Sequence, residues 1–315
     1  MGDQVKTFCM GRDVAVLWDP EEADIEGYIE SGFIPIEMAT GGKSYIDYRV
    51  LDHHNEYSDR PSACLAALGY YGEANCADNA KFMVNHADAD CVMAGITLMG
   101  LLPFDVLQDI NPEVGALDID PLSVDKDTLK YGDLIECWKV GMRGRKDSAW
   151  SWLYGVALFI DIIKNPANYA EILERIRVGE ASRVAAAMMD YERALVGKSG
   201  RVIMIPSSTV WGLDVQFGRD AGSDIDMPLS WRHWCIISKT QRSGSVFVSC
   251  PNKRIAEEVF GPGGLMNVFP KLPGINGKFW GGRESVGGSP RGETVPDAML
   301  GEILNLVDGA IVKTI

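Results

Sequence analysis

The sequence has few histidines, few basic residues and no long apolar run. Four of its 315 residues are histidine, and 30 Lys and Arg residues stand against 44 Asp and Glu residues, which gives a formal net charge of −14. The shortage of positive charge argues against a protein that grips long nucleic acid, because neutralising phosphates requires clustered Lys and Arg. The longest apolar stretch, residues 152–163, contains Asp161 and is too short to span a bilayer. We therefore expect no membrane span.

The seven cysteines follow no paired pattern. They are odd in number, widely spread and never in a CxxC spacing, which favours neither a disulfide framework nor a structural zinc site. Reduced, mostly buried thiols are the simpler interpretation. The opening residues, MGDQVKTFCMGRD, contain early acidic residues and no apolar core of signal-peptide length. The expected location is cytoplasmic.

The pattern of apolar residues predicts an α/β protein with more than one domain. Hydrophobic residues make up 46% of the chain, and its length corresponds to about two domains. Strand-like and helix-like segments alternate over the first 130 residues, which is typical of a doubly wound, mainly parallel sheet. We predict an N-terminal domain over 1–130, a helical connector over 131–195 and a smaller α/β domain over 196–315. The predicted strands are 14–18, 33–38, 45–51, 81–85, 201–205, 234–239 and 245–249; the predicted helices are 21–31, 60–71, 92–102, 252–260 and 297–307.

A run of alternating polar residues follows the predicted strand 81–85. In His86-Ala-Asp88-Ala-Asp90, alternate residues of an extended segment point the same way and present one imidazole and two carboxylates to a single point. Such ligands suit manganese, iron, zinc or magnesium, and they suit two divalent ions better than one. The alternative is that Asp90 simply caps the apolar helix that follows.

Other polar residues also stand where predicted strands end. Asp52-His53-His54 follows the predicted strand 45–51. A turn at the strand end would bring both imidazole rings to one cleft, and the alternative is a pair of histidines in a surface loop. Asp19 closes the strand 14–18. In doubly wound sheets the chemistry collects at these carboxyl ends. His233, between two tryptophans, is interpreted as interior packing.

Three segments carry a family resemblance. LDHHN with the following SACLAALGYY resembles the signature motif of the DHH phosphoesterase superfamily, and VNHADADCVMAGITL is similar to its other metal-binding motif. FWGGRESVGG resembles the glycine-rich loop of the associated C-terminal DHHA1-type substrate-binding domain, as found in the exopolyphosphatase-related and oligoribonuclease-like branch. The DHH motif here precedes the acidic run, the reverse of the family order, which indicates a permuted sheet. Arg283 stands where the family has histidine, and arginine clamps phosphate oxygens but does not act as an acid.

The resemblance implies a centre of two divalent metal ions, with manganese expected first and magnesium second. A lone aspartate is the family's bridging ligand, and Asp19 is our candidate for it. Either Asp118 or Asp120 supplies the last ligand, and we take Asp120 as the candidate. His54 stabilises developing charge or protonates the leaving oxygen, with Asp52 as a second catalytic candidate. The remaining implied metal ligands are His86, Asp88, Asp90 and His53.

The resemblance also implies a phosphate-binding loop. Its glycines remove side chains and allow positive φ, so that successive N–H groups converge on an anion. Arg283 and Arg291 add positive charge. The glycines concerned are Gly281, Gly282, Gly287 and Gly288.

The expected function is a divalent-metal-dependent phosphoesterase or phosphohydrolase. Two-metal-activated water attacks a short phosphoanhydride or phosphodiester substrate such as polyphosphate, a phosphorylated nucleotide or a short oligonucleotide. One alternative is a non-catalytic phospholigand-binding protein on the same fold, and another is a single-metal hydrolase on an unrelated α/β fold. The expected partner is a small phosphorylated substrate, and a homodimer stays open.

Overall fold

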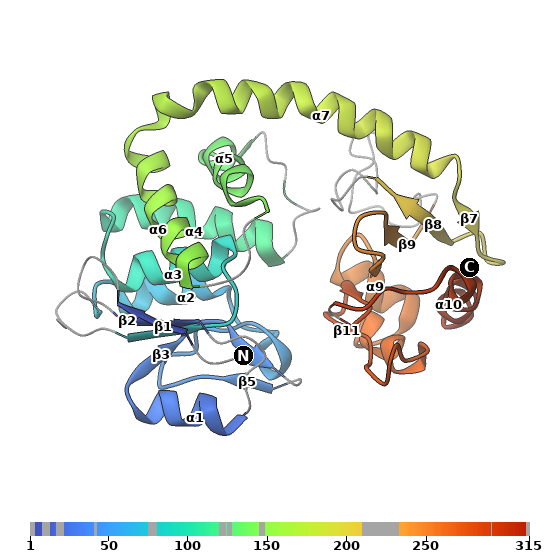
Figure 1. The fold of residues 1–315 in the computed structure, drawn as a ribbon, viewed down its shortest axis with the longest axis horizontal. Helices are drawn as coiled ribbons and strands as arrows, with labels where there is room; N and C mark the ends of the chain where they lie inside the picture. The colour runs from blue at the N-terminus through green and yellow to red at the C-terminus, as the bar shows by residue number, and fades with distance from the viewer. Residues whose placement is uncertain are drawn as a thin grey trace. The chain divides into compact units, whose positions relative to one another are not determined.

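The computed structural model describes residues 4–7, 13–16, 22–40, 43–74, 81–119, 124, 128–144, 149–209, 233–290 and 292–312. Its fold is mixed α/β, as predicted (Figure 1). The chain divides into two compact units. Unit 1 comprises Met1–Ile119 and Asp125–Ile176, and unit 2 comprises Asp120–Val124 and Arg177–Ile315.

The described sheet of unit 1 combines parallel and antiparallel strands. Its order is β1-β2-β6-β3, in which β6 pairs parallel with both neighbours and β1 pairs antiparallel with β2. A separate antiparallel hairpin is formed by β4 and β5. Because β3 and β6 run parallel, their carboxyl ends meet at one edge of the sheet, which positions the residues that follow them. The bounds are β1 Gln4–Thr7, β2 Asp13–Val16, β3 Phe33–Pro35, β4 Met38–Thr40, β5 Lys43–Tyr45 and β6 Lys81–Val84.

Helices cover this sheet. Helix α6 packs against α3, β1 and β2, while α2, α3 and α4 pack on one another. Gly95 of α3 allows a close approach, because a Cβ there would lie 2.4 Å from the Trp152 ring. No helix among the described residues is long and apolar enough to cross a membrane. The bounds are α1 Glu22–Glu30, α2 Ala63–Ala67, α3 Ala89–Leu98, α4 Phe104–Ile119, α5 Gly132–Met142, α6 Ala149–Lys164 and α7 Ala170–Tyr191, the last with residues of both units.

Three predictions for unit 1 are wrong. Residues 46–51 form no strand, because polar residues there bond to their own backbone: the Arg49 backbone N–H donates to Asp47 Oδ1 at 2.8 Å. The predicted strand 33–38 ends at Pro35 and is followed by a turn in which Glu37 has φ +48°. The single helix predicted over 60–71 is instead α2 followed by the 3₁₀ helix η2 over Leu68–Tyr70.

The described residues of unit 2 form a six-stranded sheet of order β11-β12-β10-β9-β8-β7. The three predicted strands are confirmed, with β8 and β9 parallel and β9 and β10 a hairpin. Asn252 caps α9 by accepting a hydrogen bond from the Ile255 backbone N–H at 2.9 Å. The bounds are β7 Leu195–Val196, β8 Val202–Ser208, β9 Cys235–Thr240, β10 Val246–Ser249, β11 Gly281–Gly282, β12 Val286–Gly288, α9 Lys253–Phe260 and α10 Leu300–Gly309.

The described cysteines are free thiols, as predicted. Four of them belong to the hydrophobic interior with at most 1% of their surface exposed, and Cys137 is nearly as well buried. The free cysteines are Cys64, Cys91, Cys137, Cys235 and Cys250.

Candidate metal centre

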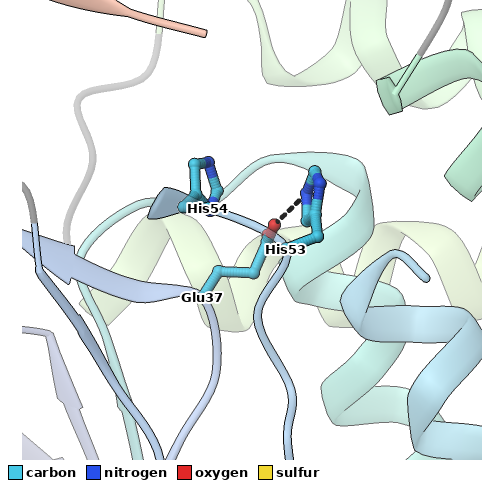
Figure 2. Close-up of side chains that lie close together, drawn as sticks. All are labelled: Glu37, His53 and His54. Atoms are coloured by element: carbon cyan, nitrogen blue, oxygen red, sulfur yellow. Dashed lines mark hydrogen bonds and ion pairs between the residues drawn. The ribbon is translucent and has the colours of Figure 1, made fainter. Parts of the chain in front are cut away.

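Five segments of unit 1 bring acidic and imidazole side chains together. Glu37 follows β3, and His53 and His54 lie in the segment before α2 (Figure 2). His86 follows β6. The rings of His53 and His54 lie 4.7 Å apart between centroids, and those of His54 and His86 lie 6.3 Å apart. Three of the four histidines therefore meet at one place. The group is completed by Asp88 and Asp90 near the start of α3 and by Asp118 near the end of α4. We call these three aspartates, Glu37 and the three histidines the acidic cluster.

Glu37 is the central residue of the acidic cluster, and the sequence analysis missed it. Its side chain is fully buried and its φ is +48°, a left-handed conformation that costs a non-glycine residue about 1 kcal/mol or more. The Glu37 backbone N–H donates to Leu51 O at 2.8 Å, which ties the turn to the segment before Asp52. The available signal was an acid inside the apolar run FIPIEMA, where an uncharged side chain is expected.

One side of the Glu37 carboxylate faces His53. Glu37 Oε1 lies 2.9 Å from His53 Nε2, the contact drawn in Figure 2. The same nitrogen lies 3.0 Å from Asp118 Oδ2 and 3.7 Å from Asp90 Oδ2. Three carboxylates thus surround one ring nitrogen, which carries at most one proton.

The other side of the Glu37 carboxylate faces His86. His86 Nε2 lies 3.3 Å from Glu37 Oε2 and 3.1 Å from Asp88 Oδ2. Burial alone would lower the pKa of His86, but the facing Asp88 and Glu37 carboxylates outweigh it and raise that pKa well above 6.5. Glu37 Oε2 itself is buried and makes no hydrogen bond within the described residues. A cation between Glu37, Asp88 and His86, either a proton or a metal ion, would therefore stabilise this side of the Glu37 carboxylate.

Asp88 and Asp90 differ in how they are held, and the cap considered for Asp90 falls to Asp88. Asp88, not Asp90, caps α3, accepting a hydrogen bond from the Cys91 backbone N–H at 3.0 Å. Asp90 lies inside α3 and reaches across to α2, where it accepts from the backbone N–H groups of Ala63 at 2.7 Å and Cys64 at 2.9 Å. Burial, with the charges of Glu37 and Asp118, raises the pKa of Asp90 well above its ordinary value. The capping of α3 by Asp90 is therefore wrong, because the helix begins one turn earlier than predicted.

His54 is held by Asp52. Asp52 Oδ1 accepts from the His54 backbone N–H at 2.9 Å and lies 2.7 Å from His54 Nδ1. Burial would raise the pKa of Asp52, but its hydrogen bonds to His54 and the charge of that ring lower it overall. Ser44 of β5 donates to His54 O at 3.2 Å and fixes the same loop from the other side. His54 is thus the histidine with a carboxylate partner of its own.

The donor set of the acidic cluster fits divalent metal ions. Ligand atoms of Glu37, His53, Asp90 and Asp118 all lie within 4.8 Å of one another, and so do those of Glu37, His86 and Asp88. Mixed carboxylate and imidazole ligands suit manganese, iron, zinc or magnesium. Two like charges about 4 Å apart repel by about 4 kcal/mol at an effective dielectric constant of about 20, more than one hydrogen bond of about 1 kcal/mol recovers. A cation is the simplest compensation.

The structure gathers most of the predicted unit 1 residues. The acidic cluster contains His53, His54, His86, Asp88 and Asp90, and Asp52 contacts it through His54. Of the two aspartates considered as the last ligand, Asp118 belongs to the cluster. Asp19, Asp120 and Arg291 lie outside the described residues.

The glycine-rich segment of unit 2 is a β-hairpin. Gly281 pairs with Gly288 and Gly282 with Gly287, so β11 and β12 are extended and none of the four has positive φ. The expected positive φ is therefore wrong. At Gly282 and Gly287 glycine serves close packing instead, since a Cβ on Gly287 would lie 2.3 Å from Phe269 Cζ. Arg283 follows β11, and its backbone N–H donates to Val286 O at 2.7 Å.

Comparison with known proteins identifies no relative. No family model matches the chain, and neither the curated proteins nor the solved structures contain a significant match. The functional interpretation of the acidic cluster therefore rests on its own geometry and on the sequence motifs that form it.

Proposed function

We propose that the protein is a divalent-metal-dependent hydrolase of phosphoester or phosphoanhydride bonds, with its centre at the acidic cluster. The observation that carries this proposal is the shared carboxylate of Glu37, which has one oxygen 2.9 Å from His53 and the other 3.3 Å from His86. A carboxylate with a ligand set on each side is the arrangement that two neighbouring cations require. The resemblance of the DHH and HADAD segments to the DHH phosphoesterase superfamily supports the same assignment.

Each ion has its own ligand set in this proposal. His86 and Asp88 would hold one ion, while His53, Asp90 and Asp118 would hold the other, and Glu37 would serve both. Glu37 thus takes the bridging role that the sequence assigned to Asp19. Manganese is the first candidate and magnesium the second, because the carboxylates are hard ligands and the imidazoles favour a transition metal. When bound, such ions lower the pKa of a coordinated water and neutralise charge on a phosphoryl group.

The chain's own residues supply the remaining chemistry. Asp52 holds His54 through Nδ1, which directs the other ring nitrogen, Nε2, away from that contact. A histidine so oriented can protonate a leaving oxygen, a role worth about 100-fold to 10,000-fold in rate. His54 is therefore the proposed general acid and Asp52 its positioning residue.

The substrate in this proposal is small and phosphorylated. The net charge of −14 disfavours long nucleic acid, which leaves polyphosphate, phosphorylated nucleotides or short oligonucleotides. The hairpin of β11 and β12, with Arg283, is the proposed phosphate-binding element of unit 2. The free, buried cysteines fit a reducing compartment, and we place the protein in the cytoplasm on that ground.

Metal analysis followed by a hydrolysis assay tests the proposal. Purified protein is analysed for bound metal and then assayed with bis-p-nitrophenyl phosphate, pyrophosphate, polyphosphate, a cyclic dinucleotide and a short RNA, each with and without Mn²⁺. We expect metal-dependent release of phosphate or nitrophenol from at least one substrate. Bound metal with binding but no turnover would favour a non-catalytic phospholigand-binding protein. Absence of both metal and turnover would overturn the proposal.

A further inference from the structure

Asn85 connects the β4–β5 hairpin to the acidic cluster. It follows β6 directly and precedes His86. Its Nδ2 donates to Ala39 O in β4 at 2.7 Å, and its Oδ1 is hydrogen-bonded to His86 Nδ1. One carboxamide therefore spans the distance between a backbone carbonyl and the imidazole ring.

These two contacts fix the direction of each hydrogen bond. A carbonyl oxygen only accepts, so the amide NH₂ group of Asn85 faces Ala39 and the amide oxygen faces the His86 ring. The amide oxygen also only accepts, so His86 Nδ1 carries the proton. A neutral His86 then has its lone pair on Nε2.

Nε2 is the His86 atom that faces the carboxylates. It lies 3.1 Å from Asp88 Oδ2 and 3.3 Å from Glu37 Oε2. With the proton held on Nδ1, three electron-pair donors converge on one point, which is the arrangement that a metal ion completes. A histidine ligand commonly donates its second N–H to a neighbouring acceptor, which sets both tautomer and ring orientation.

We infer that Asn85 is a positioning residue of the metal centre, holding His86 in the tautomer whose Nε2 binds metal. The inference rests on the metal-binding part of the proposed function. Asn85 does at His86 what Asp52 does at His54, but with an uncharged acceptor. The neutral amide adds no negative charge beside the four carboxylates of Glu37, Asp88, Asp90 and Asp118.

Affinity for Mn²⁺ in three variants gives the first test. Asn85→Leu removes both hydrogen bonds, and we expect Mn²⁺, followed by electron paramagnetic resonance, to bind about 10-fold to 100-fold more weakly. Asn85→Asp keeps the acceptor for Nδ1 and should bind more tightly than Asn85→Leu. The matched control is Asn267→Leu, because Asn267 also donates from its amide to backbone carbonyls, of Phe260 at 3.2 Å and Pro262 at 2.7 Å, but in unit 2. Its affinity should equal that of the wild type.

The imidazole ¹⁵N spectrum of the Zn²⁺-loaded protein gives the second test. The His86 signals are those lost in His86→Gln, and we expect a protonated Nδ1 and a metal-bound Nε2 in the wild type and in Asn85→Asp. A wild type that binds metal through Nδ1 overturns the inference, even where Asn85→Leu does not fold. Unchanged affinity and tautomer in a folded Asn85→Leu also overturn it, while the proposed function stands. A wild type that binds neither Mn²⁺ nor Zn²⁺ overturns both.

Discussion

The acidic cluster of unit 1 and the glycine hairpin of unit 2 differ in how their charges are arranged: like charges meet in the cluster, and opposite charges pair beside the hairpin. In the cluster, the carboxylates of Glu37, Asp90 and Asp118 converge within 4.8 Å of one another, although their charges repel. Beside the hairpin, opposite charges pair with each other, as Lys253 Nζ does with Glu284 Oε1 at 3.0 Å. Close packing explains the glycines at positions 282 and 287, whereas a Cβ on Gly281 would meet nothing within 4 Å. Residues that oppose the stability of their own fold point to function, which distinguishes the acidic cluster from the closely packed part of the hairpin.

The largest expected effect is that of replacing Glu37, the residue shared by both sides of the acidic cluster. In Glu37→Gln one carboxylate charge is lost at nearly unchanged volume, and we expect Mn²⁺-dependent turnover to fall by at least about 100-fold. The metal-free variant should unfold at a higher temperature than the metal-free wild type, because buried repulsion is relieved. Steady-state assays and thermal melts in EDTA measure both effects. Glu302→Gln on the exposed face of α10 is the matched control. An active Glu37→Gln would remove Glu37 from the centre.

Replacing His54 distinguishes the proposed acid catalysis from metal binding in unit 1. His54→Gln removes the proposed acid, and kcat should fall by about 100-fold to 10,000-fold. Asp52→Asn keeps the ring but weakens its orientation and should have a smaller effect of the same kind. Mn²⁺ affinity should stay near the wild-type value in both variants. A loss of Mn²⁺ binding in His54→Gln that matches the loss of turnover would make His54 a ligand instead.

Removing metal should make the stability of the protein depend on pH through the acidic cluster of unit 1. The pKa values of His86 and Asp90 are both raised in the folded protein, so the metal-free folded state binds more protons than the unfolded state. Stability in EDTA should therefore fall as the pH rises above 6.5, the ordinary pKa of histidine, because the unfolded state there releases the His86 proton that the folded state still binds. Mn²⁺ at about 100 times its dissociation constant should add about 2.7 kcal/mol. Unfolding midpoints at several pH values measure this, and stability in EDTA that rises over the same range would contradict it.

The smallest effect concerns the hairpin. Gly287→Ala places a Cβ 2.3 Å from Phe269 Cζ and should destabilise the protein by about 1–3 kcal/mol, with Mn²⁺ affinity unchanged. Gly281→Ala is the matched control, because a Cβ there meets nothing within 4 Å. Denaturant unfolding of the two variants measures the difference. Equal stability of both would show that packing does not explain the hairpin glycines.

The sequence predicts some parts of this site well and others poorly, for physical reasons. His86 and Asp88 are predictable because β6 is a compact apolar strand and polar residues follow its end. Glu37 is not, because it lies in an apolar run that resembles one strand, and the break after Pro35 arises from a left-handed turn that tertiary contacts stabilise. The sequence could not decide between Asp118 and Asp120, because it predicted no helix over 104–119, and α4 is the element that places Asp118.

For the glycine hairpin, the sequence identifies the residues but not the structural reason for them. Four glycines in a short segment indicate unusual backbone or close packing, and the sequence alone does not separate the two. Phe269, whose ring excludes a side chain at Gly287, lies 18 residues earlier in the chain, and no local pattern joins them. The strands of unit 2 were predictable because their alternation and turn residues are local.

The central claim, that Glu37 serves two metal ions, is tested most directly by electron paramagnetic resonance of the Mn²⁺-loaded protein. We predict two Mn²⁺ ions per chain in the wild type, with the multiline signal of two coupled ions, and loss of that coupled signal in Glu37→Gln. A wild type that binds at most one ion per chain, or two ions without coupling, would contradict the account.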